Sequence, residues 1–270
     1  MASGSTFSMS QHGRTEPFDL QVGRGQIPYH QRVELFGYSA NVGSTAAGPL
    51  WEGLTLSGGS YSYPGSAGQI VLLSASGATD AGLIVQVQGL DANFNLLSEN
   101  ATLNASGTVT TVNSYYRING LYVTNGLNAG NITAKIGGTL YAQINAGVGQ
   151  TQMSIYTVPN GYTFYLSYVQ ANASIGFTSS AYMIFTEYNK FNLSSTVTQN
   201  GYYYSNSGNT TLLSQSPFVQ IFEIPYLSPA GHPGGTDIQY QLKASTGSPY
   251  SGSIFAGGYL IAESATSQGY

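Results

Sequence analysis

Residues 236–245 read TDIQYQLKAS, and their side chains alternate between apolar and polar. The apolar set is Ile238, Tyr240, Leu242 and Ala244, and the polar set is Asp237, Gln239, Gln241 and Lys243. Successive side chains of an extended strand point to opposite faces. The alternation therefore predicts a β-strand with one buried face and one face in water.

Other stretches have the composition of strands as well. They are GLIVQVQGL (82–90), FVQIFEIPYL (218–227) and SIFAGGYLIAE (253–263). In the last of these, the pair Gly257-Gly258 predicts a β-bulge. The stretch QTQMSIYTVPNGYTFYLS (150–167) holds two aromatic and β-branched runs divided by Pro159-Asn160-Gly161. That arrangement predicts a hairpin.

Helical patterns with Glu and Lys on an outer face are nearly absent, and turn signals recur along the chain. The predicted fold class is therefore all-β, with an extended N-terminal arm followed by two antiparallel domains. Residues 1–34 form the arm, because they carry many charges and few core-type residues. Residues 35–138 form a β-sandwich domain and residues 139–270 a jelly-roll-like β domain, divided after Gly137-Gly138.

The composition excludes several classes of protein. Charged residues make up only 7% of the 270 residues, and the net charge is −4, against about 25% charged residues in a typical domain. Seven Lys and Arg residues are too few for a nucleic-acid binder. No cysteine is present, so disulfides are excluded. We expect neither a secretory leader nor a membrane-spanning helix. The neutral surface with 22 tyrosines favours contact with copies of the chain or with a partner.

No motif for catalysis or metal binding is complete. His232 and Asp237 supply two members of a Ser-His-Asp set in residue type only, without a nucleophile elbow. Residues 91–99 (DANFNLLSE) begin with the ligand spacing of a calcium loop, but Leu96 replaces the required Gly and Thr102 the required Glu. A hairpin connection explains this loop better. We therefore expect no catalytic residue, no metal site and no cofactor.

Five stretches together resemble a structural protein of tailed phages of aquatic bacteria, cyanophages especially. They are RVELFGYSANVG (32–43), PLWEGLTLSGGSYSYPGSAGQIVLLSAS (49–76), VQGLDANFNLLSENATLN (87–104), SYYRINGLYVTN (114–125) and AGVGQTQMSIYTVPNGYTFYL (146–166). The resemblance runs in the same order over most of residues 32–166 and is looser from about 170 to 265.

The resemblance implies a non-enzymatic virion component, made in the host cytoplasm and located on the capsid surface. The expected function is that of a capsid cement or decoration protein, a homotrimer that binds the major capsid protein outside the head and stabilises it. The alternative is a tail, baseplate or fibre component, with contact to host glycans as a further option. Neither role requires contact with nucleic acid or with a membrane.

Two sets of residues are the candidates for these contacts. The arm offers arginines for carboxylates on the shell or on sister chains, and spaced apolar side chains for separate pockets. These residues are Arg14, Arg24, Arg32, Leu20, Val22, Ile27 and Tyr29. A second candidate is the aromatic run Tyr202, Tyr203 and Tyr204, because tyrosine buries a large area at interfaces and can stack on sugars.

Overall fold

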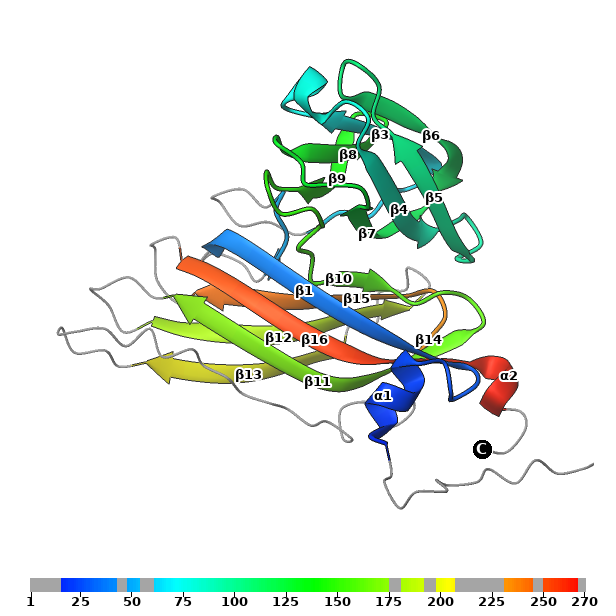
Figure 1. The fold of residues 1–270 in the computed structure, drawn as a ribbon. Helices are drawn as coiled ribbons and strands as arrows, with labels where there is room; N and C mark the ends of the chain where they lie inside the picture. Colours follow the sequence, from blue (N-terminus) through cyan, green and yellow to red (C-terminus); the bar gives the residue numbers. More distant parts are fainter. Residues whose placement is uncertain are drawn as a thin grey trace, which may run out of the picture.

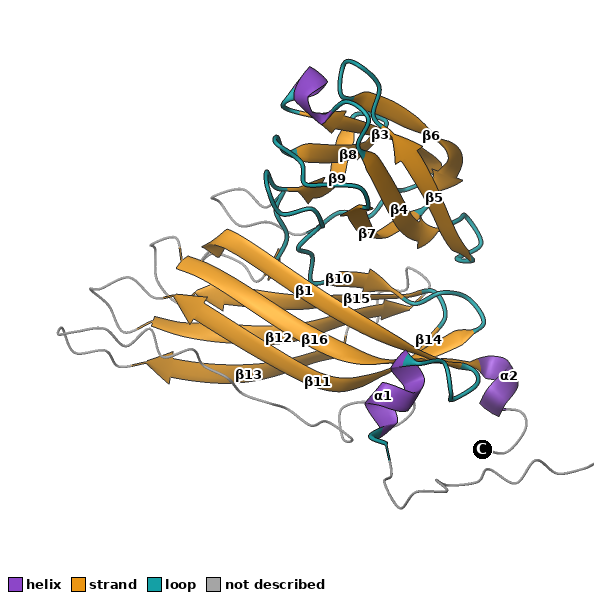
Figure 2. Cartoon of the chain, viewed as in Figure 1, coloured by secondary structure: helices purple, strands orange, loops and turns teal. Residues whose placement is uncertain are grey.

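A computed structural model describes residues 16–42, 48–53, 61–174, 181–191, 198–206, 231–244 and 250–266. The chain is all-β, as predicted, and its antiparallel strands form two stacked β-sandwiches (Figures 1 and 2). Short helices are the exception: α1 (Phe18–Gly23), the 3-10 turn Gly77–Asp80 and α2 (Glu263–Thr266).

The larger sandwich, here called the base, contains the first and the last strands of the chain. Its first sheet has the order β1 (His30–Val42), β16 (Tyr250–Ala262), β11 (Tyr162–Ser174) and β14 (His232–Pro233). Its second sheet has the order β10 (Ile155–Thr157), β15 (Thr236–Ala244), β12 (Ala181–Phe191) and β13 (Thr198–Asn206), with β2 (Gly48–Pro49) also on β15. Phe164, Ile254 and Tyr240 belong to the core between the sheets.

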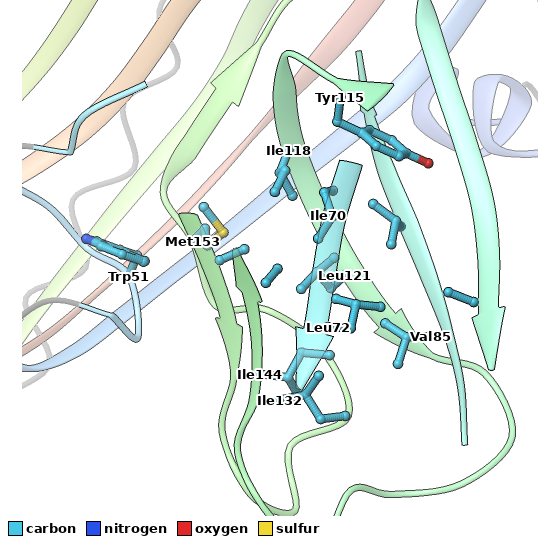
Figure 3. Packing of buried hydrophobic residues seen from close by; sticks show 14 of the residues in the cluster. Trp51, Ile70, Leu72, Val85, Tyr115, Ile118, Leu121, Ile132, Ile144 and Met153 are labelled. Atoms are coloured by element: carbon cyan, nitrogen blue, oxygen red, sulfur yellow. The ribbon is translucent and has the colours of Figure 1, made fainter. Parts of the chain in front are cut away.

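The smaller sandwich, here called the inserted domain, lies beside the base (Figure 1). One sheet has the order β6 (Thr108–Tyr115), β3 (Gly68–Ser74), β8 (Ile132–Ile136) and β9 (Thr139–Ile144). The other has the order β5 (Leu96–Thr102), β4 (Ile84–Leu90) and β7 (Arg117–Val123). Aliphatic side chains such as Ile70, Leu121 and Ile132 fill its core, and Trp51 and Met153 lie at one end of the cluster (Figure 3). Trp51, a large aromatic side chain, is 8% exposed and belongs to this core.

The two crossings between the domains lie side by side. Leu50 leads out of the base and Ser154 leads back into it. The backbone N–H of Leu50 donates to Ser154 Oγ at 2.8 Å, and the N–H of Ser154 donates to the carbonyl of Leu50 at 2.8 Å. Ser154 Oγ also donates to the carbonyl of Tyr240 at 2.6 Å. The inserted domain therefore leaves and rejoins the base at one hydrogen-bonded junction.

The predicted domain boundaries differ from this arrangement. Strand β1 pairs with β16 from His30↔Ile261 onward, so a division after residue 34 cuts a strand of the base. Gly137-Gly138, the predicted linker, is the turn of the β8–β9 hairpin, and both glycines have positive φ (58° and 86°). Such turns favour glycine at both central positions. Pairing between the two ends of a chain leaves no local signal, so the sequence did not show the insertion.

Two strand predictions are confirmed, while the predicted hairpin at 150–167 is wrong. Residues 82–90 contain β4 and residues 253–263 contain most of β16. Gly161 has φ 78° and ends a turn as expected, but β10 and β11 belong to different sheets of the base. The turn therefore carries the chain from one sheet to the other. A bulge lies between Leu166 and Tyr168 of β11, opposite the glycine pair of β16. Residues 218–227 lie outside the described residues.

Candidate interaction surface

The polar face of β15 is buried, which corrects the prediction of a wet face. The strand itself and the burial of Ile238, Tyr240 and Leu242 are confirmed. Asp237 and Gln239 are only 1% and 3% exposed, however. Gln239 Nε2 donates to the hydroxyl of Tyr63, 3.2 Å away in the segment that leads into the inserted domain. The face is covered by another part of the same chain.

A bidentate ion pair joins the two domains at this covered face. Arg117, the first residue of β7, donates from Nε to Asp237 Oδ1 at 2.8 Å and from Nη2 to Oδ2 at 3.0 Å. Both side chains are 1% exposed. Thr157 Oγ1 donates to Asp237 Oδ1 at 2.6 Å, and Arg117 Nη1 donates to the carbonyl of Tyr116 at 2.9 Å. Most polar atoms of the pair therefore have partners, as a buried pair requires.

Aromatic rings enclose the guanidinium of Arg117. Its Cζ lies 4.2 Å from the ring centroid of Tyr116, 4.6 Å from that of Tyr63 and 5.4 Å from that of Phe94. Burial by itself lowers the pKa of Arg117, but the hydrogen bonds and the charge of Asp237 outweigh it, so the pKa is raised. Arg117 stays charged, and the cluster acts as a fixed clasp between the domains.

The predicted arm is described only from Glu16, and residues 16–34 do not form an extended arm. Residues 18–23 form α1, which packs on the outer face of the first sheet beside β1 (Figure 1). Val22 is 4% exposed, so its side chain packs inside this molecule and is not available to another one. The ring of Phe18 meets Tyr259 edge-on at 5.1 Å. The predicted interface role of Val22 is therefore wrong, because an amphipathic turn of helix buries it.

The other predicted arm residues have different environments. Leu20 and Tyr29 are 43% and 48% exposed, and Ile27 is half-buried. Arg24 pairs with Glu16, and Arg32 pairs with Glu34. A hydrogen bond with Tyr168 raises the pKa of Arg32. Arg14 lies outside the described residues. Leu20 and Tyr29 thus keep the exposure that a contact with another molecule needs.

The outer face of the first sheet carries a band of aromatic residues, here called the aromatic face. Its members are Phe18, Phe36, Tyr165, Tyr168, Phe255 and Tyr259. Strand register places Phe36 beside Phe255, and Tyr259 beside Tyr165. Phe18 and Phe36 are 47% and 36% exposed. Exposed aromatic side chains gathered on one face are typical of protein interfaces.

The run Tyr202–Tyr204 lies elsewhere. It belongs to β13, at the edge of the second sheet, where its backbone pairs with Phe185, Ile184 and Met183 of β12. The strand is thus separate from the aromatic face, which belongs to the first sheet. Sequence reasoning selected these tyrosines by local density, whereas the aromatic face is assembled from α1, β1, β11 and β16.

The residues of the two incomplete sequence motifs have other partners in the structure. The ring of His232 stacks on that of Phe164 with 6.3 Å between the ring centroids, and Asp237 forms its ion pair with Arg117. The loop at 91–95 is the predicted hairpin connection, in which Asp91 Oδ1 accepts from the backbone N–H groups of Asn93 and Asn95. No group of three His, Asp or Glu residues in the described ranges is close enough to hold a metal ion. The same ranges contain no helix that could span a membrane.

Comparison of the chain with family models, curated proteins and solved structures found no match.

Two functional features were missed from the sequence. Arg117 and Asp237 are 120 positions apart, and neither stands in a motif. Glu52 is the second: both oxygens of its carboxylate are buried. Burial raises the pKa of Glu52 to about 7, although the backbone amides of Asn145 and Gln152 lower it in part. An isolated Arg in a strand, in a chain with few charges, is the one signal that could have identified the clasp.

Proposed function

We propose that the protein is a non-enzymatic structural component of a phage virion, a decoration or cement protein bound to the outside of the capsid as a homotrimer. The aromatic face is the observation that carries the proposal. It combines exposed rings with a helix at its margin, and the Arg32–Glu34 pair lies on the same face of β1. A surface of this kind loses little on desolvation and gains apolar contact area.

The rest of the molecule suits a passive binder. The clasp between the domains fixes their arrangement, so that little ordering cost remains when the protein binds a rigid shell. Leu20 and Tyr29 of the N-terminal segment offer further exposed apolar surface, since they are 43% and 48% exposed. Many bound copies would stabilise a capsid by mass action. The alternative is a tail, baseplate or fibre component, which would be present in far fewer copies per particle than a cement protein.

The experiment adds purified variants to particles of the phage that lack this protein and measures occupancy. Phe18→Ser combined with Phe36→Ser should weaken binding at least about tenfold, since about 1.4 kcal/mol of lost apolar contact gives that factor. The matched control is Val112→Ser, which changes a side chain on β6 of the inserted domain that is 82% exposed. Equal occupancy of both variants would contradict the proposal.

The copy number in purified particles tests whether the protein belongs to the head or to the tail. A cement protein should approach the amount of the major capsid protein on a gel. A copy number more than about tenfold lower would favour the tail, baseplate or fibre alternative.

A further inference from the structure

A groove of about 440 Å³ lies between β1 of the base and the inserted domain. Val33 and Leu35 of β1 belong to one wall, and Leu97 of β5 belongs to the opposite wall. None of the six residues that define the aromatic face lines the groove. Its volume lies within the range of sites for small molecules, about 300–1,000 Å³. The groove is therefore a candidate site for a small ligand.

The lining of the groove combines apolar side chains with neutral groups that form hydrogen bonds. The neutral polar side chains of the lining include those of Gln31, Gln88, Asn119, Tyr122 and Tyr156. The charged side chains of the lining, Arg32 and Glu34, form an ion pair with each other. The groove thus suits a ligand that is polar and uncharged.

Asn119 is held in a fixed orientation by the backbone of β10. Its Nδ2 donates to the carbonyl of Thr157 at 2.9 Å, and its Oδ1 accepts from the N–H of Thr157 at 3.0 Å. A side-chain amide has two N–H donors and two acceptor lone pairs, so this pairing uses half of them. Because the side chain is already ordered, a ligand that binds it loses little free energy in fixing it.

Tyr156 supplies a second observation that points to a ligand. Its side chain is 6% exposed, lines the groove and packs on Phe164 with 5.8 Å between the ring centroids. Within the described part of the chain, no group hydrogen-bonds to its hydroxyl. Burial raises the pKa of Tyr156, so the hydroxyl stays protonated and can donate. Buried polar groups in proteins usually have a hydrogen-bond partner, and a bound ligand would supply one here.

We propose that the groove binds a neutral saccharide. Sugar hydroxyls both donate and accept hydrogen bonds, as do the amides of the lining and the hydroxyl of Tyr156. The C–H face of a sugar ring is apolar and matches Leu97 and the half-buried ring of Tyr122. A charged sugar is disfavoured, because Arg32 and Glu34 already neutralise each other. The inference does not depend on the proposed capsid role.

Saturation-transfer difference NMR on the free, full-length protein tests the inference. The probes are three neutral disaccharides, which are maltose, lactose and N,N′-diacetylchitobiose, and the anionic sugar glucuronate. We expect at least one of the neutral disaccharides to bind, and to bind more tightly than glucuronate. If none of the three binds, or if glucuronate binds more tightly than all of them, the inference is wrong.

Tyr156→Phe locates the bound sugar, since it removes the hydroxyl and keeps the ring in the core. The affinity should fall at least about fivefold, which is the factor expected for one lost hydrogen bond. The matched control is Tyr115→Phe, because the hydroxyl of Tyr115 is also buried but the residue does not line the groove. Equal affinities of the two variants would contradict the role of Tyr156.

Gln88→Ala tests the same site without changing the core, because Gln88 is exposed on β4. It should also weaken the binding of the sugar about fivefold. Gln69→Ala is its control, since Gln69 is an exposed residue of β3 that does not line the groove. Unchanged binding by Gln88→Ala would place the sugar outside the groove and overturn the inference. Because the measurement uses free protein, such a failure would leave the capsid proposal standing.

Discussion

Two sheet faces of the base differ in a way that their sequences do not suggest. The face of β15 with Asp237 and Gln239 is polar, yet the inserted domain buries it. The outer face with Phe36 and Tyr259 is aromatic, yet it is open to solvent apart from α1. The polar face can be buried because Arg117 satisfies the carboxylate of Asp237, whereas α1 is the element of the described chain that packs on the aromatic face and it leaves Phe36 exposed. The difference shows that the exposure of a sheet face depends on the element packed against it, and not on the polarity of its own side chains.

The largest expected effect concerns the clasp. Arg117→Ala leaves the buried carboxylate of Asp237 without its cation, which costs about 3–5 kcal/mol of the free energy of unfolding. Denaturation with urea, followed by tyrosine fluorescence, measures this loss. Arg32→Ala is the matched control, because the Arg32–Glu34 pair is exposed and contributes about 0–1 kcal/mol. Similar losses for both variants would remove the distinction between the two faces.

Replacing both members of the clasp sharpens the same point. Arg117→Met combined with Asp237→Leu removes both charges while keeping apolar volume, so it should cost less than Arg117→Ala alone. A double variant at least as unstable as the single variant would show that the aromatic enclosure, and not the uncompensated charge, dominates the loss.

The next largest effect is expected at the junction of Leu50 and Ser154, where the two crossings between the domains meet. A Cβ added at Gly37 would lie 2.5 Å from Ser154 Cβ and 2.9 Å from the carbonyl of Leu50. Gly37→Ala should therefore push the two crossings apart and cost about 1–3 kcal/mol, measured by thermal unfolding. Gly23→Ala is the control, because nothing lies within 4 Å of its added Cβ. Equal melting temperatures for the two variants would contradict the close approach at the junction.

The sequence allowed the strands to be predicted but not their partners. Alternation identified β15 and β4, because a period of two is a local property. The pairing of β1 with β16 and the contact of Arg117 with Asp237 join residues more than a hundred positions apart, and a single sequence carries no local record of them. For the same reason, the predicted interface residues included the buried Val22 and did not include Phe36, which is 36% exposed.

Glu52 offers a smaller, pH-dependent test near the junction. Burial raises the pKa of Glu52 to about 7 from the usual 4.5. Below about pH 4.5 the carboxyl is protonated in both the folded and the unfolded chain, so it carries no penalty. As the pH rises from 4.5 to 7, Glu52 ionises in the unfolded chain but stays protonated in the folded one. The free energy of unfolding therefore falls over this range. Glu52→Gln should remove this fall, with the melting temperature measured at pH 5 and pH 8. An unchanged difference between the two pH values would contradict the burial of this carboxylate.

The smallest expected effect on stability is at the aromatic face. Phe36→Ser changes a side chain that is 36% exposed, so the free energy of unfolding should change by about 1 kcal/mol or less. A loss comparable to that of Arg117→Ala would mean that Phe36 belongs to the core of the base and is not held for a partner.

Hydroxyl-radical footprinting of free and particle-bound protein tests most directly whether the aromatic face docks on the capsid. In free protein, Phe18, Phe36 and Tyr29 should be labelled because they are exposed, as should Val112 and Leu127 of the inserted domain. On the particle, labelling of the first three should fall several-fold, while Val112 and Leu127 keep theirs. If Phe18 and Phe36 remain fully labelled on saturated particles, the aromatic face is not the docking surface, and the central claim is wrong.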